Sequence, residues 1–249
     1  MGRLVITIVG NGGCLNNGLP YNACLLQGRL LLEAPPDIMP SLMRLGLDHG
    51  RIDRVFISHL HGDHTFGLPF LVINLWMKSL VEKDSPTLTV LGPPGIAAHA
   101  RVLVLAAFTA EHPCLSWFDK HVSFQTVGET FETAWEGLTL SSVALEHAVP
   151  TFGLVLTAGQ EPVFAYLSDT RWCPNVEKIL AGKPKVVLLD MNGGNPDLHT
   201  SREEVQKKGL LLTAGRTVIY GTHLFEPFLE DSGNLRCARP GETLLIEWP

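Results

Sequence analysis

Residues 55–64, with the sequence VFISHLHGDH, constrain this chain more than any other stretch. Their apolar, β-branched start is typical of a buried strand, which delivers the backbone to a fixed point. Side chains that can bind a metal follow at once: His59, His61, Asp63 and His64. Because Gly62 lets the turn bend, the first two can face one side and the last two the other. We therefore predict a metal site, whose turn could serve two ions about 3.5–4 Å apart. A polar loop with chance histidines is the alternative.

The spacing His59-x-His61-x-Asp63-His64 resembles the signature of the metallo-β-lactamase superfamily, and the resemblance extends over nearly the whole chain. It implies an α/β (α+β) chain folded as a four-layer αββα sandwich, in which two β-sheets pack face to face with helices outside. It also implies that the metal ions lie at one edge of the sandwich. We therefore expect residues 1–249 to form a single domain of this type.

The same resemblance implies further metal ligands, each after a later strand. The candidates are His147, Asp169 and His223, each of which follows a predicted strand. A single histidine in such a place is more often a packed or surface residue, but together the three occur in the order that the family shows. We expect one ion on His59, His61 and His147, a second ion on Asp63, His64 and His223, and Asp169 as the bridge.

The ligand types bear on the metal and on the reaction. Imidazole and carboxylate groups without thiolate suit Zn²⁺, Mn²⁺ or Fe²⁺ and do not choose among them. Two such ions would lower the pKa of a shared water toward about 7. They would also stabilise negative charge on a phosphoryl or carbonyl oxygen. We therefore expect a dinuclear metal-dependent hydrolase.

His199, just before a predicted helix, bears on which bond is cleaved. It falls where phosphodiesterase members of the superfamily, ribonuclease Z among them, keep a catalytic histidine. The resemblance implies that His199 protonates the leaving oxygen or clamps a phosphate oxygen. We expect His199 and Asp63 to be the catalytic residues, while a histidine without a task near a helix start is the alternative. Asp190 either orients His199 or caps a turn.

Four other stretches narrow the resemblance: PTFG at 150–153, YLSDT at 166–170, VVLLD at 186–190 and TH at 222–223. They are similar to those of the phosphoribosyl cyclic phosphate phosphodiesterases of phosphonate degradation. That family has a Cys-rich structural zinc site near its N-terminus, where this chain offers only Cys14 and Cys24.

We therefore expect a phosphodiesterase for a small or cyclic phosphodiester. One alternative is a carbonyl-ester hydrolase, such as a lactonase or thioesterase, on the same metal pair. Another is the endonuclease that processes transfer-RNA 3′ ends. That enzyme inserts a long basic arm between the third His and the bridging Asp, and residues 148–168 offer none.

Composition limits the partners and the compartment. A net charge of −6, with no basic run, argues against a nucleic-acid partner. The five scattered cysteines lack a Cys-x-x-Cys pair and suit a reducing compartment. The apolar run at 4–9 is too short for a signal-peptide core, and no run is long enough to span a membrane. We expect a cytoplasmic enzyme with a small-molecule phosphodiester substrate and no membrane partner.

Two other stretches are open to more than one interpretation. The apolar residues 68–80 are preferably a core helix, but they could instead line the pocket mouth or join two subunits of a homodimer. The glycine-rich residues 10–13 could cradle a phosphate, although a tight turn is preferred.

Hydrophobic patterns and turn signals predict the remaining elements. Strands are expected over 4–9, 22–27, 29–33, 87–91, 122–127, 137–145, 152–157, 163–167, 185–189, 217–220 and 242–247. Helices are expected over 37–47, 68–80, 96–108, 175–180 and 201–214.

Overall fold

Two mixed β-sheets of seven strands each form the centre of the molecule, in a computed structural model that describes residues 2–82, 86–228 and 230–249. The first sheet has the strand order β14-β1-β2-β3-β4-β5-β6. Its strands are β1 (Gly2–Gly10), β2 (Ala23–Leu26), β3 (Leu30–Leu32), β4 (Arg54–Phe56), β5 (Leu88–Gly92), β6 (Val122–Thr126) and β14 (Thr243–Trp248). The N- and C-terminal strands β1 and β14 pair antiparallel within this sheet.

The second sheet has the order β13-β12-β11-β10-β9-β8-β7. Its strands are β7 (Glu132–Trp135), β8 (Leu138–Leu145), β9 (Thr151–Ala158), β10 (Glu161–Leu167), β11 (Val186–Asp190), β12 (Val218–Thr222) and β13 (Leu235–Cys237). In both sheets an antiparallel part is followed by a parallel part. The parallel parts are β3 to β6 in the first sheet and β10 to β13 in the second.

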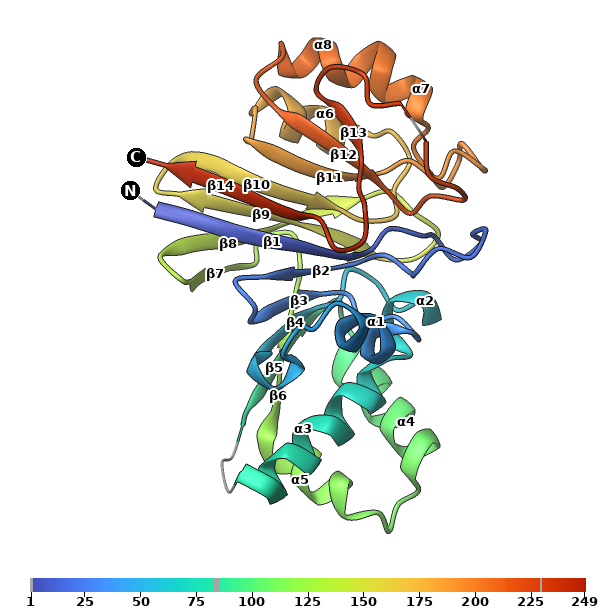
Figure 1. Cartoon of the computed structure of the whole chain (residues 1–249), viewed down its shortest axis with the longest axis vertical. Helices are drawn as coiled ribbons and strands as arrows, with labels where there is room; N and C mark the ends of the chain where they lie inside the picture. Colours follow the sequence, from blue (N-terminus) through green and yellow to red (C-terminus); the bar gives the residue numbers. More distant parts are fainter. Residues whose placement is uncertain (1, 83–85, 229) are drawn as a thin grey trace.

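Helices cover the outer face of each sheet (Figure 1). On the side of the first sheet lie α1 (Ile38–Arg44), η1 (His49–Arg51), α2 (Gly62–Thr65), α3 (Leu68–Glu82), α4 (Ile96–Phe108) and α5 (Pro113–His121). On the side of the second lie α6 (Pro174–Ala181), α7 (Arg202–Glu204), the π-helical turn η2 (Val205–Gly209) and α8 (Leu210–Thr213). The arrangement is the expected αββα sandwich. Among the described residues, no helix has both the length and the apolar character to cross a bilayer.

Apolar side chains lie on both faces of the buried strands, so each sheet packs against the other sheet on one face and against helices on the other face. On β10, Phe164 and Tyr166 join a cluster between the sheets, whereas Ala165 and Leu167 join a cluster beneath the helices of the second sheet. The ring of Tyr166 meets Phe56 of the first sheet edge to face, with centroids 6.4 Å apart. The two sheets are thus joined by aromatic packing close to the ends of β4 and β10.

Most predicted elements form within a few residues of their expected bounds. The helix over 96–108 has the expected bounds, and the expected helix over 201–214 forms as the consecutive segments α7, η2 and α8. The short elements η1, α2, α5, β7 and β13 were not predicted.

The apolar stretch 68–80 belongs to α3. Its Leu71, Val72 and Leu75 are buried in the core, so the interpretation as a core helix is confirmed for that face. Met77 and Leu80 on the same helix are 49% and 58% exposed. A homodimer through this exposed face stays a prediction.

The glycine-rich residues 10–13 allow close packing. A Cβ on Gly10 would lie 1.9 Å from the carbonyl oxygen of Tyr21, and one on Gly13 would lie 2.7 Å from that of His223. Only glycine avoids these clashes. The loop thereby packs directly against the segment that follows β12.

The topology brings the predicted site residues to one edge of the sandwich. Strands β8, β10, β11 and β12 of the second sheet run in the same direction, so their carboxyl ends share one edge. The parallel strands β3 and β4 of the first sheet end beside Glu33 and His59, respectively. Polar side chains that are far apart in the sequence can therefore meet there.

Candidate metal centre

The loop after β4 carries the first group of candidate ligands. The short helix α2 begins at Gly62 with His61 as its N-cap, so His59 and His61 precede the helix while Asp63 and His64 lie on it. The Nε2 atom of His59 lies 3.0 Å from Nδ1 of His61, and Nε2 of His64 lies 3.4 Å from Oδ2 of Asp63. His59 thus lies beside His61 and Asp63 beside His64, and the ring centroids of His59 and His64 are 4.0 Å apart as well.

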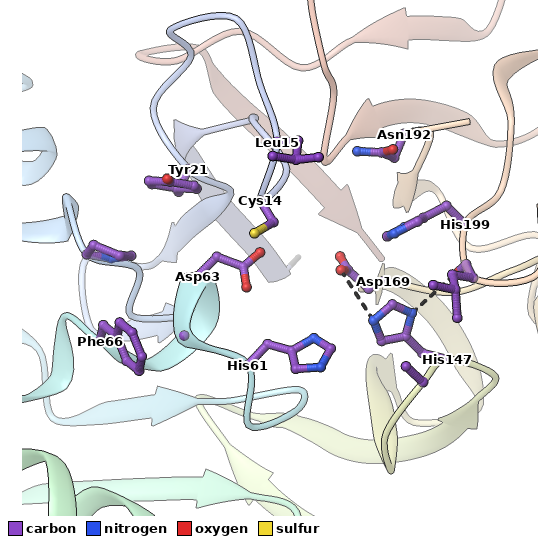
Figure 2. Close-up of a pocket in the computed structure, with 14 residues that line it drawn as sticks. Cys14, Leu15, Tyr21, His61, Asp63, Phe66, His147, Asp169, Asn192 and His199 are labelled. Carbon is purple, nitrogen blue, oxygen red and sulfur yellow. Dashed lines mark hydrogen bonds and ion pairs between the residues drawn. The ribbon is translucent and has the colours of Figure 1, made fainter. Parts of the chain in front are cut away.

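Asp169, two residues beyond β10, lies among the other candidates. Its Oδ1 is 3.1 Å from Nε2 of His223 and 3.7 Å from Nε2 of His64. Its Oδ2 is 3.7 Å from Nε2 of His147. The two carboxylate oxygens therefore face different groups of histidines, which is the arrangement that a bridging ligand needs. Figure 2 shows Asp169 with His61, Asp63 and His147 around one cavity.

The donor atoms are close enough to share metal ions. Those of His59, His61 and His147 all lie within 4.8 Å of one another, and so do those of His59, His64 and Asp169. All of the sequence-predicted ligands come together at this edge. How they divide between two ions is taken up below as a proposal.

In three of these histidines, the ring nitrogen that faces away from the site has a polar neighbour. These contacts are His59 Nδ1 with Ser58 Oγ at 2.9 Å, His147 Nδ1 with the Leu198 carbonyl oxygen at 3.1 Å, and His223 Nδ1 with Thr222 Oγ1 at 2.9 Å. Such contacts fix the ring orientation and leave the other nitrogen free for a metal. Sequence reasoning did not identify these supporting residues.

Glu33, at the end of β3, is the most important residue that sequence reasoning missed. It is fully buried, and its Oε2 lies 3.3 Å from Nδ1 of His64. The hydroxyl of Tyr166 donates to its Oε1 at 2.9 Å, and the backbone N–H of Ser58 donates to its carboxylate as well. The signal was present in the sequence, since a lone carboxylate ends the buried apolar run Leu30-Leu31-Leu32.

Charge and burial set the protonation of this cluster. Burial, together with His64, lowers the pKa of His59, so this imidazole is neutral and free to bind a cation. Burial alone would lower the pKa of His64, but Glu33 and Asp169 raise it well above its ordinary value. Burial would raise the pKa of Asp169, but His223 and His64 hold it well below its ordinary value. The carboxylate of Asp169 is thus ionised at neutral pH.

The residues fit a divalent metal. Both ring nitrogens of His64 and Oδ1 of Asp169 are buried without a hydrogen-bond partner among the described residues. Buried polar atoms normally have partners, and unpaired ones are costly. A cation among these imidazoles and carboxylates would satisfy Nε2 of His64 and Oδ1 of Asp169, while Nδ1 of His64 faces Glu33. Nitrogen and oxygen donors suit Zn²⁺, Mn²⁺ and Fe²⁺.

The backbone at His223 is strained in a way that serves the site. Its φ is +57°, in the left-handed region that non-glycine residues seldom adopt. Such a conformation costs about 1–3 kcal/mol and persists only when the surroundings hold it. The loop of residues 10–13 does so here, because the N–H of Leu224 donates to the carbonyl oxygen of Asn11 at 2.8 Å.

His199 lies at the same cavity, next to the candidate ligands. Its Nδ1 is 2.7 Å from Oδ2 of Asp190, and its ring centroid is 5.2 Å from that of His147. Burial would lower the pKa of His199, but the hydrogen bond to Asp190 raises it above its ordinary value. The ring is therefore placed by a buried carboxylate and holds its proton more tightly than a free histidine.

Asp190 both orients His199 and caps a turn, so the two interpretations from the sequence are compatible. It is fully buried at the end of β11. Its Oδ2 also accepts from the N–H of Thr170 at 3.0 Å, and its Oδ1 accepts from that of Asn192 at 2.8 Å.

The cavity has a volume of about 660 Å³, a size typical of small-molecule sites. The residues that line it are Cys14, Leu15, Tyr21, Pro36, His61, Gly62, Asp63, Phe66, His147, Ala148, Asp169, Asn192, Leu198 and His199. Cys14 is exposed here, whereas Cys24 is buried in the core between the sheets. The two cysteines therefore do not form a shared metal site, in keeping with the departure seen in the sequence.

Comparisons with known proteins find ribonucleases among the relatives of this chain. Ribonuclease Z of Staphylococcus carnosus is 30% identical over 128 residues, which cover 51% of this chain and 39% of the relative. Ribonuclease BN of Proteus mirabilis is 38% identical over 112 residues, which cover 45% of this chain and 33% of the relative. The match thus spans less than half of the length of these curated relatives. Their names agree with the expectation of a hydrolase.

Solved structures share the fold. The metallo-beta-lactamase fold protein YhfI from Bacillus subtilis has a TM-score of 0.74 and 16% identity, covering 98% of this chain and 100% of its own. The short form of human tRNase Z has a TM-score of 0.71 and 19% identity, and the match covers 96% of this chain and 98% of that structure. A diphosphatase from the PhnP family has a TM-score of 0.72 and 17% identity, and the match covers 98% of this chain and 97% of that structure.

A family model goes beyond fold similarity. The model described as the beta-lactamase superfamily domain matches residues 28–222, a span that includes every candidate ligand except His223, which follows directly. The family and fold expected from the sequence are therefore confirmed. This chain belongs to the beta-lactamase superfamily.

Proposed function

We propose that the chain is a dinuclear metal-dependent phosphodiesterase for a small phosphodiester. The observation that carries the proposal is the placement of His199, which Asp190 holds at 2.7 Å on the wall of the same cavity as the candidate ligands. Relatives named as ribonucleases, and a structural neighbour named as a diphosphatase, support chemistry at phosphorus.

We assign His59, His61 and His147 to one divalent ion, Asp63, His64 and His223 to a second, and Asp169 to both. Zn²⁺ or Mn²⁺ suits this donor set best, and Fe²⁺ is compatible with it. When bound, such ions supply an acidified water and stabilise negative charge on phosphoryl oxygens.

His199 supplies the proton-bearing group of this proposal. Its Nδ1–H donates to Asp190, which leaves Nε2 directed away from that carboxylate. Because the pKa of His199 is raised, Nε2 carries a proton over more of the neutral range than in a free histidine. This N–H can donate to the leaving oxygen of the substrate or to a non-bridging phosphate oxygen. Asp63, on the same cavity, acts through the metal site.

Hydrolysis of bis(p-nitrophenyl) phosphate with Mn²⁺ or Zn²⁺ tests the function. We expect turnover by the wild-type chain and, for an alkyl phosphodiester under the same conditions, a loss of about 100-fold or more in His199→Ala. The matched control is His121→Ala, at the end of α5 and away from the cavity, which should keep wild-type activity. Wild-type turnover of the alkyl phosphodiester no greater than that of His199→Ala would contradict the proposal.

The leaving group separates the two roles of His199. p-Nitrophenolate departs without a proton, whereas an alkoxide needs one. If His199 protonates the leaving oxygen, His199→Ala should slow an alkyl phosphodiester far more than the nitrophenyl ester. If it binds a phosphate oxygen, the two substrates should slow equally.

RNA is the second candidate substrate, because the curated relatives are ribonucleases. The chain between His147 and Asp169 argues against it: β9 and β10 pair as a tight antiparallel hairpin, without an arm that could grip RNA. Faster cleavage of a transfer-RNA precursor than of small diesters would favour this candidate. Carbonyl-ester hydrolysis is the third candidate, and faster cleavage of a lactone or thioester than of any phosphodiester would favour it.

A further inference from the structure

The cavity beside the metal centre has an apolar rim. Leu15 and Phe66 line it although they are 77% and 52% exposed, and Tyr21 and Pro36 line the same side. Figure 2 shows Leu15, Tyr21 and Phe66 around the side of the cavity where Asp63 lies. Exposed apolar side chains gathered at a pocket are typical of a ligand-binding surface.

The rim is held in place by the fold. The loop that carries Leu15 is anchored because the N–H of Asn17 donates to the carbonyl oxygen of Phe225 at 2.7 Å. The ring of Phe66 lies against the backbone of the ligand loop, since a Cβ on Gly62 would fall 2.6 Å from ring carbons. Both side chains are therefore presented next to the metal ligands by ordered contacts.

The apolar surface continues beyond the cavity. Pro36 and Phe66 also border a second hollow of about 380 Å³, whose other lining residues are Pro69, Phe70, Leu103, Ala106 and Ala107. A group bound beside the metal centre therefore has apolar contacts available along its length.

The charges around the cavity also limit which substrates can bind. Among the described residues that line it, none is Lys or Arg, and the carboxylates of Asp63 and Asp169 face into it. Arg171, at an adjoining hollow, is paired with the carboxylate of Glu146. Metal ions can neutralise one phosphodiester, but a further anionic group would enter an apolar rim without a partner, which is costly.

From the rim and the absence of Lys and Arg among the described residues that line the cavity, we infer that it selects phosphodiesters that carry one negative charge and whose second ester group is bulky, apolar and uncharged. The inference rests on the proposed function and deepens it. The ester group to be cleaved lies at the metal centre and His199, while the retained apolar group packs on Leu15, Tyr21, Pro36 and Phe66. Substrates with additional phosphate or carboxylate groups are disfavoured.

Three matched esters test the inference: methyl, benzyl and 4-carboxybenzyl p-nitrophenyl phosphate. All three release p-nitrophenolate, so intrinsic reactivity is nearly constant and differences in kcat/KM report on binding of the second group. In the presence of Mn²⁺, we expect the benzyl ester to be favoured over the methyl ester by about tenfold or more, from burial of the ring. We expect the 4-carboxybenzyl ester to be slower than the benzyl ester.

Substitutions in the rim test whether its side chains cause the preference for the benzyl ester. In Leu15→Asn and Phe66→Ser the benzyl-to-methyl ratio should fall toward one, whereas Leu211→Asn, which changes a 78% exposed leucine on α8, should keep the wild-type ratio. Leu15 and Phe66 lie on separate segments, so if one variant fails to fold, the other still tests the rim.

The outcomes separate this inference from the function on which it rests. A wild-type benzyl-to-methyl ratio near one, an unchanged ratio in both rim variants, or a faster 4-carboxybenzyl ester would overturn the inference while leaving a phosphodiesterase. Failure to hydrolyse any of the three esters would overturn the proposed function, and the inference with it.

Discussion

In the first sheet, one loop after β4 supplies His59, His61, Asp63 and His64, whereas the second sheet supplies its candidate ligands one at a time, after β8, β10 and β12. The first group depends on local spacing and on the short helix α2. The second depends on strand direction and register over residues 138–223. A local motif can thus be recognised from a few residues. A prediction of the dispersed ligands is correct only if every strand of the second sheet is predicted correctly.

The two groups also differ in what supports them. Behind the loop of the first sheet, Glu33 contacts His64 and binds Tyr166 of the second sheet, which links the two sheets beneath the site. Behind the second-sheet ligands, Asp190 holds His199. One buried carboxylate thus supports a candidate ligand and the other supports a candidate proton donor. Substitutions at these positions can show whether the two roles are separable.

Asp169→Asn should have the largest effect, because it removes the charge that faces histidines of both sheets. We expect kcat/KM for a phosphodiester to fall by about 1,000-fold, as much as in His61→Ala. Metal content and steady-state kinetics measure this. Asp119→Asn, at an exposed ion pair on α5, is the control. If Asp169→Asn kept a tenth of wild-type activity, the second sheet would not be an equal contributor to the site.

Glu33→Gln should weaken metal binding by about 10–100-fold, because the carboxylate behind His64 orients the ring and makes it a better ligand. Competition with a chromophoric chelator measures the affinity. Glu203→Gln, in an exposed pair with Lys207, is the control. An unchanged affinity would show that the contact between Glu33 and His64 serves only the core.

Asp190→Asn should lower kcat by about tenfold, with metal content close to that of the wild type, because it disturbs the ring of His199 rather than a metal ligand. Kinetics and metal analysis of the same preparation check both parts. Loss of metal in step with activity would mean that the two roles are not separable.

Arg29→Ala should have the smallest effect. Arg29 pairs with Asp53 in the first sheet region and with Glu136 beside the second, but the contacts are solvent-exposed. We expect a change of about 0–1 kcal/mol in the free energy of unfolding, measured by chemical denaturation. A loss above about 2 kcal/mol would mean that surface pairing, and not the core near Tyr166, joins the sheets.

The sequence predicted what depends on local pattern. The ligand loop, the bounds of α4 and the order of the long strands all follow from spacing and apolar periodicity. The short elements β7 and β13 were not predicted because they are edge strands of few residues, whose pairing is set by the neighbouring strand. Glu33 was missed because a carboxylate at the end of an apolar run does not by itself indicate a role, and its contacts form only where β3, β4 and β10 meet.

The cavity rim was beyond sequence reasoning for a similar reason. Leu15 lies in an irregular loop and Phe66 just after α2, and neither belongs to a periodic pattern. Their common position depends on how the two loops fold back beside the candidate metal ligands. Such residues can be placed only when the packing of both sheets is known.

Anomalous diffraction from crystals of the chain grown with Zn²⁺ or Mn²⁺ tests most directly whether both sheets build one metal centre. We predict two ions, one among His59, His61 and His147 and the other among Asp63, His64 and His223, with Asp169 between them. A single ion held only by residues of the loop after β4, or ions beyond reach of His147, Asp169 and His223, would contradict this prediction.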